Sequence, residues 1–263
     1  MDKLVSVIIP SYNDGDIMAR AVNSALKQKH LFELIIVNDC STDDSLSVAE
    51  RLCDLDQRIA VFSTAKNGGP AAARNFGALF ARGYYLAFLD TDDEYLPDFL
   101  ETTVAFLETT PGMHAVKTGV LFVDVDGRPM LDPGDPRIEA LTFSIPNNML
   151  ILRESFEAMG GFPTDPVFRL EHAGEDVAFN KAVAKYLQPL GRIDQAGYRF
   201  WNKKDSHLER FLANTHVTGD TFEFVTLSAL QQPDGPLQKA IDSYMANVES
   251  RMTRKTVVAS TGK

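Results

Sequence analysis

A regular alternation of short apolar runs and helical patterns is the feature of this sequence that most limits its fold. The first 95 residues contain four apolar runs, each too short for a typical helix and rich in residues that favour strands. Helical stripes lie between them, such as the one from Ile17 to Leu26. Nearly all-apolar strands that alternate with helices predict an α/β fold with a mostly parallel central sheet flanked by helices. The four predicted strands are Leu4–Ile9, Leu34–Val37, Ile59–Phe62 and Tyr84–Leu89.

This alternation is lost from about residue 97 onward. Four prolines and one glycine in the segment Arg128–Pro146 predict a long functional loop. After Trp201 the patterns predict helices, with a last apolar stripe from Leu237 to Met252. The other predicted elements are helices over Asp98–Leu107 and about Asp176–Tyr186, and strands over Val116–Val125 and Met149–Leu152.

The charge and cysteine content narrow the class of protein. The 263 residues include 36 acidic and 26 basic side chains, a formal net charge of −10, which disfavours a nucleic-acid binder because such proteins need a basic surface. Cys40 and Cys53 form neither a CxxC pair nor a disulfide framework, which favours a reducing compartment. No apolar stretch approaches the roughly 18 residues of a membrane span. We therefore expect a cytoplasmic protein without a transmembrane segment, and peripheral contact with the inner face of the membrane stays open.

Polar residues follow each of the four predicted strands. In open α/β sheets, ligands bind beyond the carboxyl ends of the strands, so these residues would meet at one edge. We therefore expect a binding site there. The segments are Pro10-Ser11-Tyr12-Asn13-Asp14, Asn38-Asp39, Asn67-Gly68-Gly69 and Asp90-Thr91-Asp92-Asp93.

Two acidic motifs are candidates for chemistry. Asp90 and Asp92 project to the same side of an extended segment, and their oxygens suit a magnesium or manganese ion bridged to substrate phosphates. Glu175 and Asp176 open the predicted helix of the second half. Acidic residues at a helix start are favoured by capping and by the helix dipole. The local sequence alone therefore leaves open whether this pair is structural or supplies a general base.

Together these motifs resemble the family 2 glycosyltransferases of the GT-A fold, from about Val5 to Ser206. In the second half, Gly160-Gly161-Phe162 followed by Glu175-Asp176 resembles the acceptor-side block. The resemblance implies a nucleotide-sugar-binding half over residues 1–95 and an acceptor-binding, catalytic half of the same domain over 96–206. A helical C-terminal extension over 207–263 would follow. The blocks of the first half that carry the resemblance are Val5–Asn13, Leu34–Asp43, Asn67–Gly77 and Phe88–Asp93.

The resemblance implies an inverting transfer of a sugar from a nucleotide-diphosphate donor, with a UDP-sugar favoured, to an acceptor hydroxyl. The acceptor would be a glycan or a lipid-linked glycan, in cell-surface glycan or polysaccharide synthesis. Asp92 would hold Mn²⁺ or Mg²⁺, and Asp176, with Glu175 beside it, would be the catalytic base. Asp39 would accept from the base ring and Asp90 would approach the ribose. The implied donor-binding residues are Pro10, Tyr12, Asn13, Asp14, Asp39, Asn67, Arg74, Asp90 and Thr91.

Some positions depart from the pattern of this family. Asn38 precedes Asp39 where a second acid is usual, and Tyr198–Trp201 stands where many members have basic or histidine residues. His207 is a candidate metal or phosphate contact, or a surface residue. Two other functions stay open. A sugar nucleotidyltransferase would need a glycine-rich, basic loop after the first strand, which this chain lacks, and a non-catalytic nucleotide-sugar-binding module would not need both acidic motifs.

The acidity of the predicted site has a consequence for its ligand. At least five carboxylates are expected at one edge, and they would repel a bare diphosphate. A divalent cation would reconcile this site with an anionic donor, so the sequence predicts metal dependence. The five residues are Asp39, Asp90, Asp92, Glu175 and Asp176.

Overall fold

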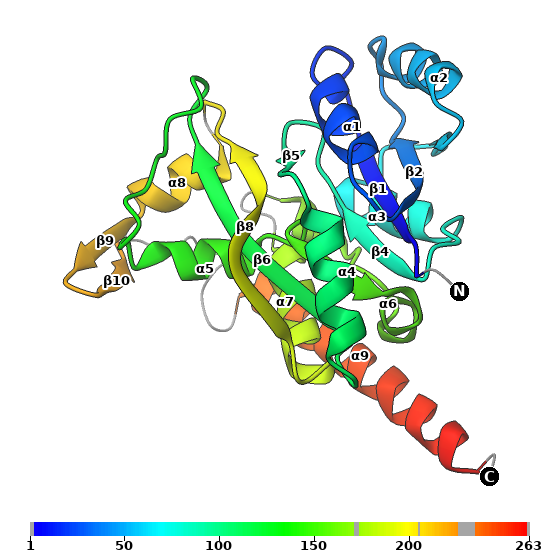
Figure 1. Ribbon diagram of the computed structural model, residues 1–263. Helices are drawn as coiled ribbons and strands as arrows, with labels where there is room; N and C mark the ends of the chain where they lie inside the picture. The colour runs from blue at the N-terminus through cyan, green and yellow to red at the C-terminus, as the bar shows by residue number, and fades with distance from the viewer. Residues whose placement is uncertain (1–2, 171–173, 205, 226–234, 262–263) are drawn as a thin grey trace.

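The computed structural model describes residues 3–170, 174–204, 206–225 and 235–261. Within these residues, eight strands form one mixed central sheet with helices packed on it, and two more strands form a separate hairpin (Figure 1). The order of the strands in the sheet is β3-β2-β1-β4-β7-β6-β8-β5. They are β1 (Val5–Ser11), β2 (Leu31–Asn38), β3 (Ile59–Ser63), β4 (Tyr85–Phe88), β5 (Glu94–Tyr95), β6 (Ala115–Val123), β7 (Met149–Leu152) and β8 (Gly191–Trp201).

The first half of the sheet is parallel, as the sequence predicts. β1 pairs with β2 and with β4, and β2 pairs with β3, all in parallel. Every residue of β1 is buried. Its side chains alternate between two cores, because Val7 faces the core that contains α1 (Met18–Leu26) and Ile8 faces the core that contains α3 (Pro70–Ala78). This two-sided burial explains why the strands read as continuous apolar runs.

The helix α3 lies unusually close to the sheet. A Cβ on Gly77 would come within 2.7 Å of the Cγ2 atom of Ile8, so only glycine fits at this position. Pro70 is the first residue of the helix, where its missing N–H costs no hydrogen bond. The close approach carries Arg74, on the same helix, to the carboxyl ends of the strands. The other helices are α2 (Ser45–Leu55), α4 (Phe99–Thr109), α5 (Arg137–Ser144), α6 (Arg153–Met159), η1 (Pro166–Arg169), α7 (Glu175–Tyr186), α8 (His207–Ala213) and α9 (Pro236–Thr261).

The second half of the sheet is mixed. β7 is antiparallel to both β4 and β6, and β8 runs parallel to β6. β5 is a two-residue strand that pairs with the end of β8, with Tyr95 opposite Tyr198. Neither β5 nor β8 is predicted by the sequence patterns. Their pairing matters for function because it brings the end of β8 back to the segment that follows Asp92.

The predicted loop over Arg128–Pro146 is wrong in part, because this segment contains the helix α5. The prolines lie outside the helix: three precede it, and Pro146 follows its end. Pro136 is its N-cap, a place where proline is well tolerated. Asp135 also forms an ion pair with Arg137, and Leu141 is buried. The prolines therefore delimit a helix here and do not prevent one.

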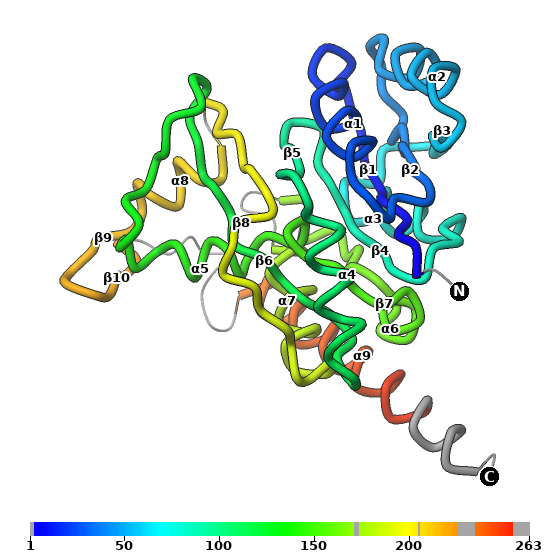
Figure 2. Tube along the Cα trace, viewed as in Figure 1, coloured from blue at the N-terminus to red at the C-terminus, as the bar shows by residue number. Residues whose placement is uncertain are grey.

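The C-terminal region is helical at α8 and α9, as predicted, but it also contains a hairpin that the sequence patterns miss. The hairpin consists of β9 (Thr215–Thr218) and β10 (Thr221–Phe224), and Figure 2 places it on the side of the molecule away from α2. The helix α9 packs on α6, α7 and η1, and its far end extends beyond the body (Figure 1). Tyr244 on α9 donates to the carbonyl of Gly161 at 2.7 Å, which ties the C-terminal helix to the turn after α6.

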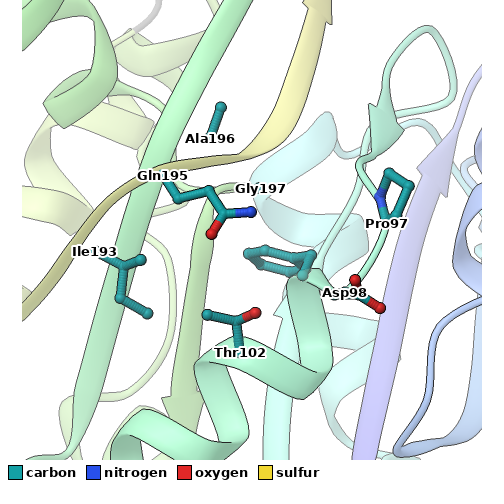
Figure 3. A pocket seen from close by; sticks show the side chains of 8 residues that line it. Pro97, Asp98, Thr102, Ile193, Gln195, Ala196 and Gly197 are labelled. Atoms are coloured by element: carbon teal, nitrogen blue, oxygen red, sulfur yellow. The ribbon is translucent and has the colours of Figure 1, made fainter.

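A small hollow lies between β8 and the start of α4 (Figure 3). It occurs where the register between β6 and β8 is irregular, near Gly119. Gln195 and Thr102 lie across from one another at its rim. Its volume of about 10 Å³ has room for about one water molecule, so it is too small to hold a substrate.

Candidate active site

The carboxylate of Asp39 organises the loop between β3 and α3. This residue follows β2 and is buried. Its oxygens accept hydrogen bonds from the backbone N–H groups of Gly68 at 2.9 Å and Gly69 at 2.7 Å, and from the hydroxyl of Thr64 at 2.7 Å. Asn67, in the same loop, is held from the other side by the guanidinium of Arg169, which donates to its carbonyl at 3.0 Å. The predicted residues Asp39 and Asn67 thus meet at one edge of the sheet.

The loop after β1 is joined to the segments that follow β2 and β4. Asp14 accepts a hydrogen bond from the hydroxyl of Thr91 at 2.8 Å, and burial raises the pKa of its carboxyl group. Asn13 has a positive φ of 57° and accepts from the N–H of Thr42 at 2.8 Å. Tyr12 is 45% exposed beside them, whereas Pro10 is buried within β1. The first loop therefore presents an exposed aromatic ring next to the hydrogen-bonded residues Asn13 and Asp14.

The most informative contact of the site is made by Arg74. Its guanidinium donates to Oδ1 of Asp90 at 2.7 Å and to Oδ1 of Asp176 at 2.8 Å. The arginine side chain is 2% exposed, and the two acids are each about one third exposed. Asp90 follows β4 and Asp176 lies in the first turn of α7, so one buried cation joins the two acidic motifs that the sequence singles out.

Burial and charge act in opposite directions on this trio. Burial disfavours the charged form of Arg74, but the charges of Asp90 and Asp176 outweigh it and raise the pKa of the guanidinium. Burial raises the pKa of the Asp176 carboxyl, while the charge of Arg74 lowers it and that of Asp90 raises it, and the net change is upward. Asp176 is therefore a stronger proton acceptor than an aspartate in water.

Asp92 is paired with a cation that sequence reasoning missed. Its Oδ2 atom lies 2.7 Å from the ammonium of Lys203, whose side chain is 66% exposed. Arg20 on α1 donates to the backbone carbonyl of Asp92, and its guanidinium lies 4.5 Å from the centre of the Trp201 ring. The signal that would have found Lys203 is its place just after Tyr198–Trp201, the block in which basic residues are expected.

Asp93 is the acid of the Asp90–Asp93 segment whose side chain is fixed by hydrogen bonds to β8. It is buried and accepts from the hydroxyl of Tyr198 and, at 2.7 Å, from the N–H of Trp201. Burial, together with the charges of Asp92 and Asp90, raises its pKa well above the ordinary value. Carboxylate oxygens of Asp90, Asp92 and Asp93 lie within 4.8 Å of one another, so this cluster could hold a metal ion. Both oxygens of Asp93 accept hydrogen bonds from β8, whereas the ion pairs of Asp90 and Asp92 each engage one oxygen, so Asp90 and Asp92 are the better ligands.

Glu175 is buried beside Asp176 and takes a different role. Its Oε2 atom accepts from the N–H of Gly174 at 2.9 Å. Burial, and then the charge of Asp176, raises the pKa of Glu175 to about 7. The folded chain thus keeps a proton on Glu175 that the unfolded chain, with an ordinary pKa of 4.5, releases. Stability should therefore fall as the pH rises from about 4.5 to about 7.

We expect Glu175→Gln to remove this fall, because glutamine has no proton to lose. The free energy of unfolding of the variant should rise relative to the wild type between about pH 5 and pH 8, by up to roughly 3 kcal/mol. Urea unfolding at several pH values measures the difference. Glu139→Gln, at a side chain that is 76% exposed, is the matched control and should show no such trend. Parallel stability curves for Glu175→Gln and wild type would contradict the assignment.

His207 is the first residue of α8. Ser206 caps that helix through its hydroxyl, which accepts from the N–H of Glu209 at 3.1 Å.

No helix in the described ranges is both long enough and apolar enough to cross a membrane.

A comparison with protein families identifies the group. The model of the family named glycosyl transferase family 2 matches residues 6–160, which include the Asp39 loop and the Asp90–Asp93 segment. The chain belongs to glycosyltransferase family 2. The chain is 40% identical over 141 residues to TuaG of Bacillus subtilis, which is named a putative teichuronic acid biosynthesis glycosyltransferase. The match covers 53% of this chain and 55% of TuaG, so the chain spans about half the length of that relative.

Two further comparisons support the family and the fold. An uncharacterized glycosyltransferase of Haemophilus influenzae is 35% identical over 185 residues, covering 67% of this chain and 70% of the relative. Among solved structures, S. aureus TarS 1–349 in complex with UDP-GlcNAc aligns with a TM-score of 0.63 at 20% identity, covering 94% of this chain and 72% of that one. The predicted fold of the GT-A type is thereby confirmed.

Proposed function

We propose that this family 2 glycosyltransferase transfers a sugar, with inversion, from a UDP-sugar to a hydroxyl of a glycan or lipid-linked glycan, with the help of a divalent metal. The observation that carries the proposal is the bridge through Arg74, because it joins the acid expected at the donor to the acid expected to act as base. The assembly of cell-surface polysaccharide is the favoured setting, since TuaG is assigned to teichuronic acid biosynthesis.

The nucleotide base would lie between Tyr12 and the loop that Asp39 holds. Three donors occupy three of the roughly four acceptor positions of the Asp39 carboxylate, which leaves one for an N–H of the base. Asn13, Asp14, Asn67 and Thr91 would shape this half of the site. The complex of TarS with UDP-GlcNAc is the reason to favour uracil.

A divalent metal would be held by Asp92, with Asp90 beside it toward the ribose. Hard carboxylate oxygens suit Mg²⁺ or Mn²⁺, and the cluster is compact enough for one ion. When bound, the metal supplies positive charge that stabilises the departing diphosphate. Lys203 would contact the same diphosphate from the end of β8, because its ammonium already lies at Asp92.

Asp176 would take the proton of the acceptor hydroxyl. Its raised pKa, and its partial exposure beside a fully buried arginine, suit a general base. A single displacement at the anomeric carbon by the activated oxygen inverts the configuration. In this proposal residues 1–95, together with Lys203, bind the donor, and the rest of residues 96–206 bind the acceptor. The reaction takes place on the cytoplasmic side, where a lipid-linked acceptor would be in reach.

A thermal-shift series with manganese tests the donor half of the proposal. UDP and a UDP-sugar should raise the midpoint of unfolding more than GDP at the same concentration, because a ligand that binds only the folded chain stabilises it more when its affinity is higher. GDP that stabilises the chain as well as UDP would contradict the choice of base, and nucleotide diphosphates without effect would contradict the proposal itself.

Asp92→Ala is expected to abolish the manganese-dependent part of this shift. The variant loses the acid that pairs with Lys203 and would hold the metal. Its affinity for Mn²⁺ should fall by more than the roughly 10- to 100-fold that loss of an outer-shell partner costs, and UDP binding should become independent of Mn²⁺. Titration of UDP with and without Mn²⁺ measures both effects. Asp194→Ala, at a side chain that is 96% exposed, is the control and should bind as the wild type does. If Mn²⁺ still assists UDP binding in Asp92→Ala, the metal must bind to other residues.

A further inference from the structure

Lys117 is a buried lysine that the proposed chemistry does not use. It lies on β6 and is 6% exposed. Its ammonium donates to the carbonyl of Phe143 at 2.9 Å, to the carbonyl of Ile145 at 2.6 Å and to Oδ1 of Asn180 at 2.9 Å. All three partners are acceptors, so the three protons of an ammonium group are each placed. Burial lowers its pKa to about 7, while the charge of Asp176 acts in the opposite direction.

Asn180 connects Lys117 to α7, the helix that carries Asp176. It is 1% exposed and lies one turn after Asp176 on α7. Its amide nitrogen donates to the carbonyl of Asp176 and to the carbonyl of Ser144, both at 2.9 Å. The backbone that carries the Asp176 carboxylate is therefore tied to Lys117 through a single side chain.

The same ammonium also holds the end of α5. Phe143 and Ser144 are the last two residues of that helix, and Ile145 is its C-cap. A helix C-terminus presents free carbonyl groups and a partial negative charge, which a buried cation satisfies. Lys117 therefore fixes the first turn of α7 and the end of α5 relative to each other. The segment that contains α5 belongs to the half expected to bind the acceptor.

We propose that Lys117 is a positioning residue for Asp176: through Asn180 and the end of α5, it sets where the base carboxylate meets the acceptor hydroxyl. This proposal rests on the proposed function of Asp176. The proposed donor contacts come from other elements, namely the ends of β1, β2, β4 and β8 and the helix α3. Loss of Lys117 should therefore lower kcat without weakening the binding of the donor. A misplacement of about 1 Å costs on the order of 100-fold in rate.

Two variants test the proposal, because one of them keeps the lysine. Lys117→Met removes the ammonium at similar length, and Asn180→Asp keeps an acceptor for Lys117 but cannot donate to Asp176 and Ser144. Each should lower kcat for transfer by roughly 10- to 100-fold, with KM for the donor within about 2-fold of wild type. Glu33→Gln is the matched control, because Glu33 is 4% exposed and hydrogen-bonded to Ser6 and Arg82, away from the site. It should keep the kcat of the wild type.

Hydrogen exchange gives a readout that does not need activity. Amides of the first turn of α7 and the end of α5 should lose protection in Lys117→Met and Asn180→Asp but not in Glu33→Gln. Unchanged exchange, unchanged kcat, or a rise in donor KM alone would overturn the proposal. An equal loss of kcat in Glu33→Gln would overturn it too. If the wild-type chain binds UDP but transfers no sugar, the proposed function is contradicted. In that case hydrogen exchange still tests Lys117, because unchanged exchange in Lys117→Met and Asn180→Asp would refute its positioning role.

Discussion

Replacing Asp176 with asparagine is expected to stop sugar transfer while leaving donor binding intact. Asparagine has the same size and keeps a carbonyl oxygen for Arg74, but it cannot take the proton of the acceptor hydroxyl. General-base catalysis contributes about 10²–10⁴-fold to the rate, so kcat should fall by a factor of about that size. Release of UDP in the presence of acceptor measures turnover, and the thermal shift with UDP and manganese measures donor binding.

The control for Asp176→Asn is the same substitution at Asp194, whose side chain is 96% exposed on β8. It should transfer sugar at the wild-type rate. Near-normal turnover in Asp176→Asn would remove this residue from the mechanism. A loss of the UDP-dependent shift together with activity would show that the residue serves donor binding instead.

Arg74→Met is expected to cost both stability and activity. Removing one partner of a buried ion pair costs roughly 3–5 kcal/mol when both groups are buried. Asp90 and Asp176 are each about one third exposed, so we expect about 2–3 kcal/mol in the free energy of unfolding. Transfer should be lost as well, because Asp90 and Asp176 then repel each other. Urea unfolding and turnover of the same preparation measure the two effects.

The pH dependence of the stability of Arg74→Met distinguishes the effect of the lost charge from the effect of the lost packing. Without the arginine, the pKa of Asp176 rises further, so the folded variant gains protons that the wild type does not bind. Its stability deficit should therefore shrink as the pH falls from neutral to about 4. The double variant Arg74→Met, Asp176→Asn should also be more stable than the sum of the two changes predicts, since it removes the repelling charge. A deficit that is the same at every pH would point to packing alone.

The first half of the fold follows from the sequence because β1, β2 and β4 are buried on both faces, apart from the exposed Phe32 of β2. Their sequences are nearly all apolar, and the helices between the strands have clear apolar stripes. β8 could not be found in this way, since exposed and partly exposed residues such as Arg192 and Gln195 interrupt its apolar pattern. Its place is set by pairing with β6, a contact between segments that are about 75 residues apart. α5 is not predicted by the sequence pattern, because the four prolines around it favour a loop.

The sequence places the acids and Arg74 among the candidate site residues, but it does not show which acids Arg74 pairs with, and it does not single out Lys203 or Lys117. Acidic and amide residues stand directly after strands, and the rule for open α/β sheets places them at one edge. Arg74 and Asp176 are 102 positions apart, so their contact depends on how α3 and α7 approach each other, which no local pattern records. Lys117 reads as one polar residue within an apolar strand. Its role depends on α5 and Asn180, which only the folded chain brings to it.

The pairing of acids with cations changes what the net charge of −10 means for the encounter with the donor. Three acids of the site, Asp90, Asp92 and Asp176, are opposed by Arg74 and Lys203, so these five ion-paired groups together carry a formal charge of only −1. Paired charges produce a weak field a few ångströms away, and salt screens what is left. A nucleotide sugar should thus reach this site at a rate that depends little on ionic strength, although the chain as a whole is strongly acidic.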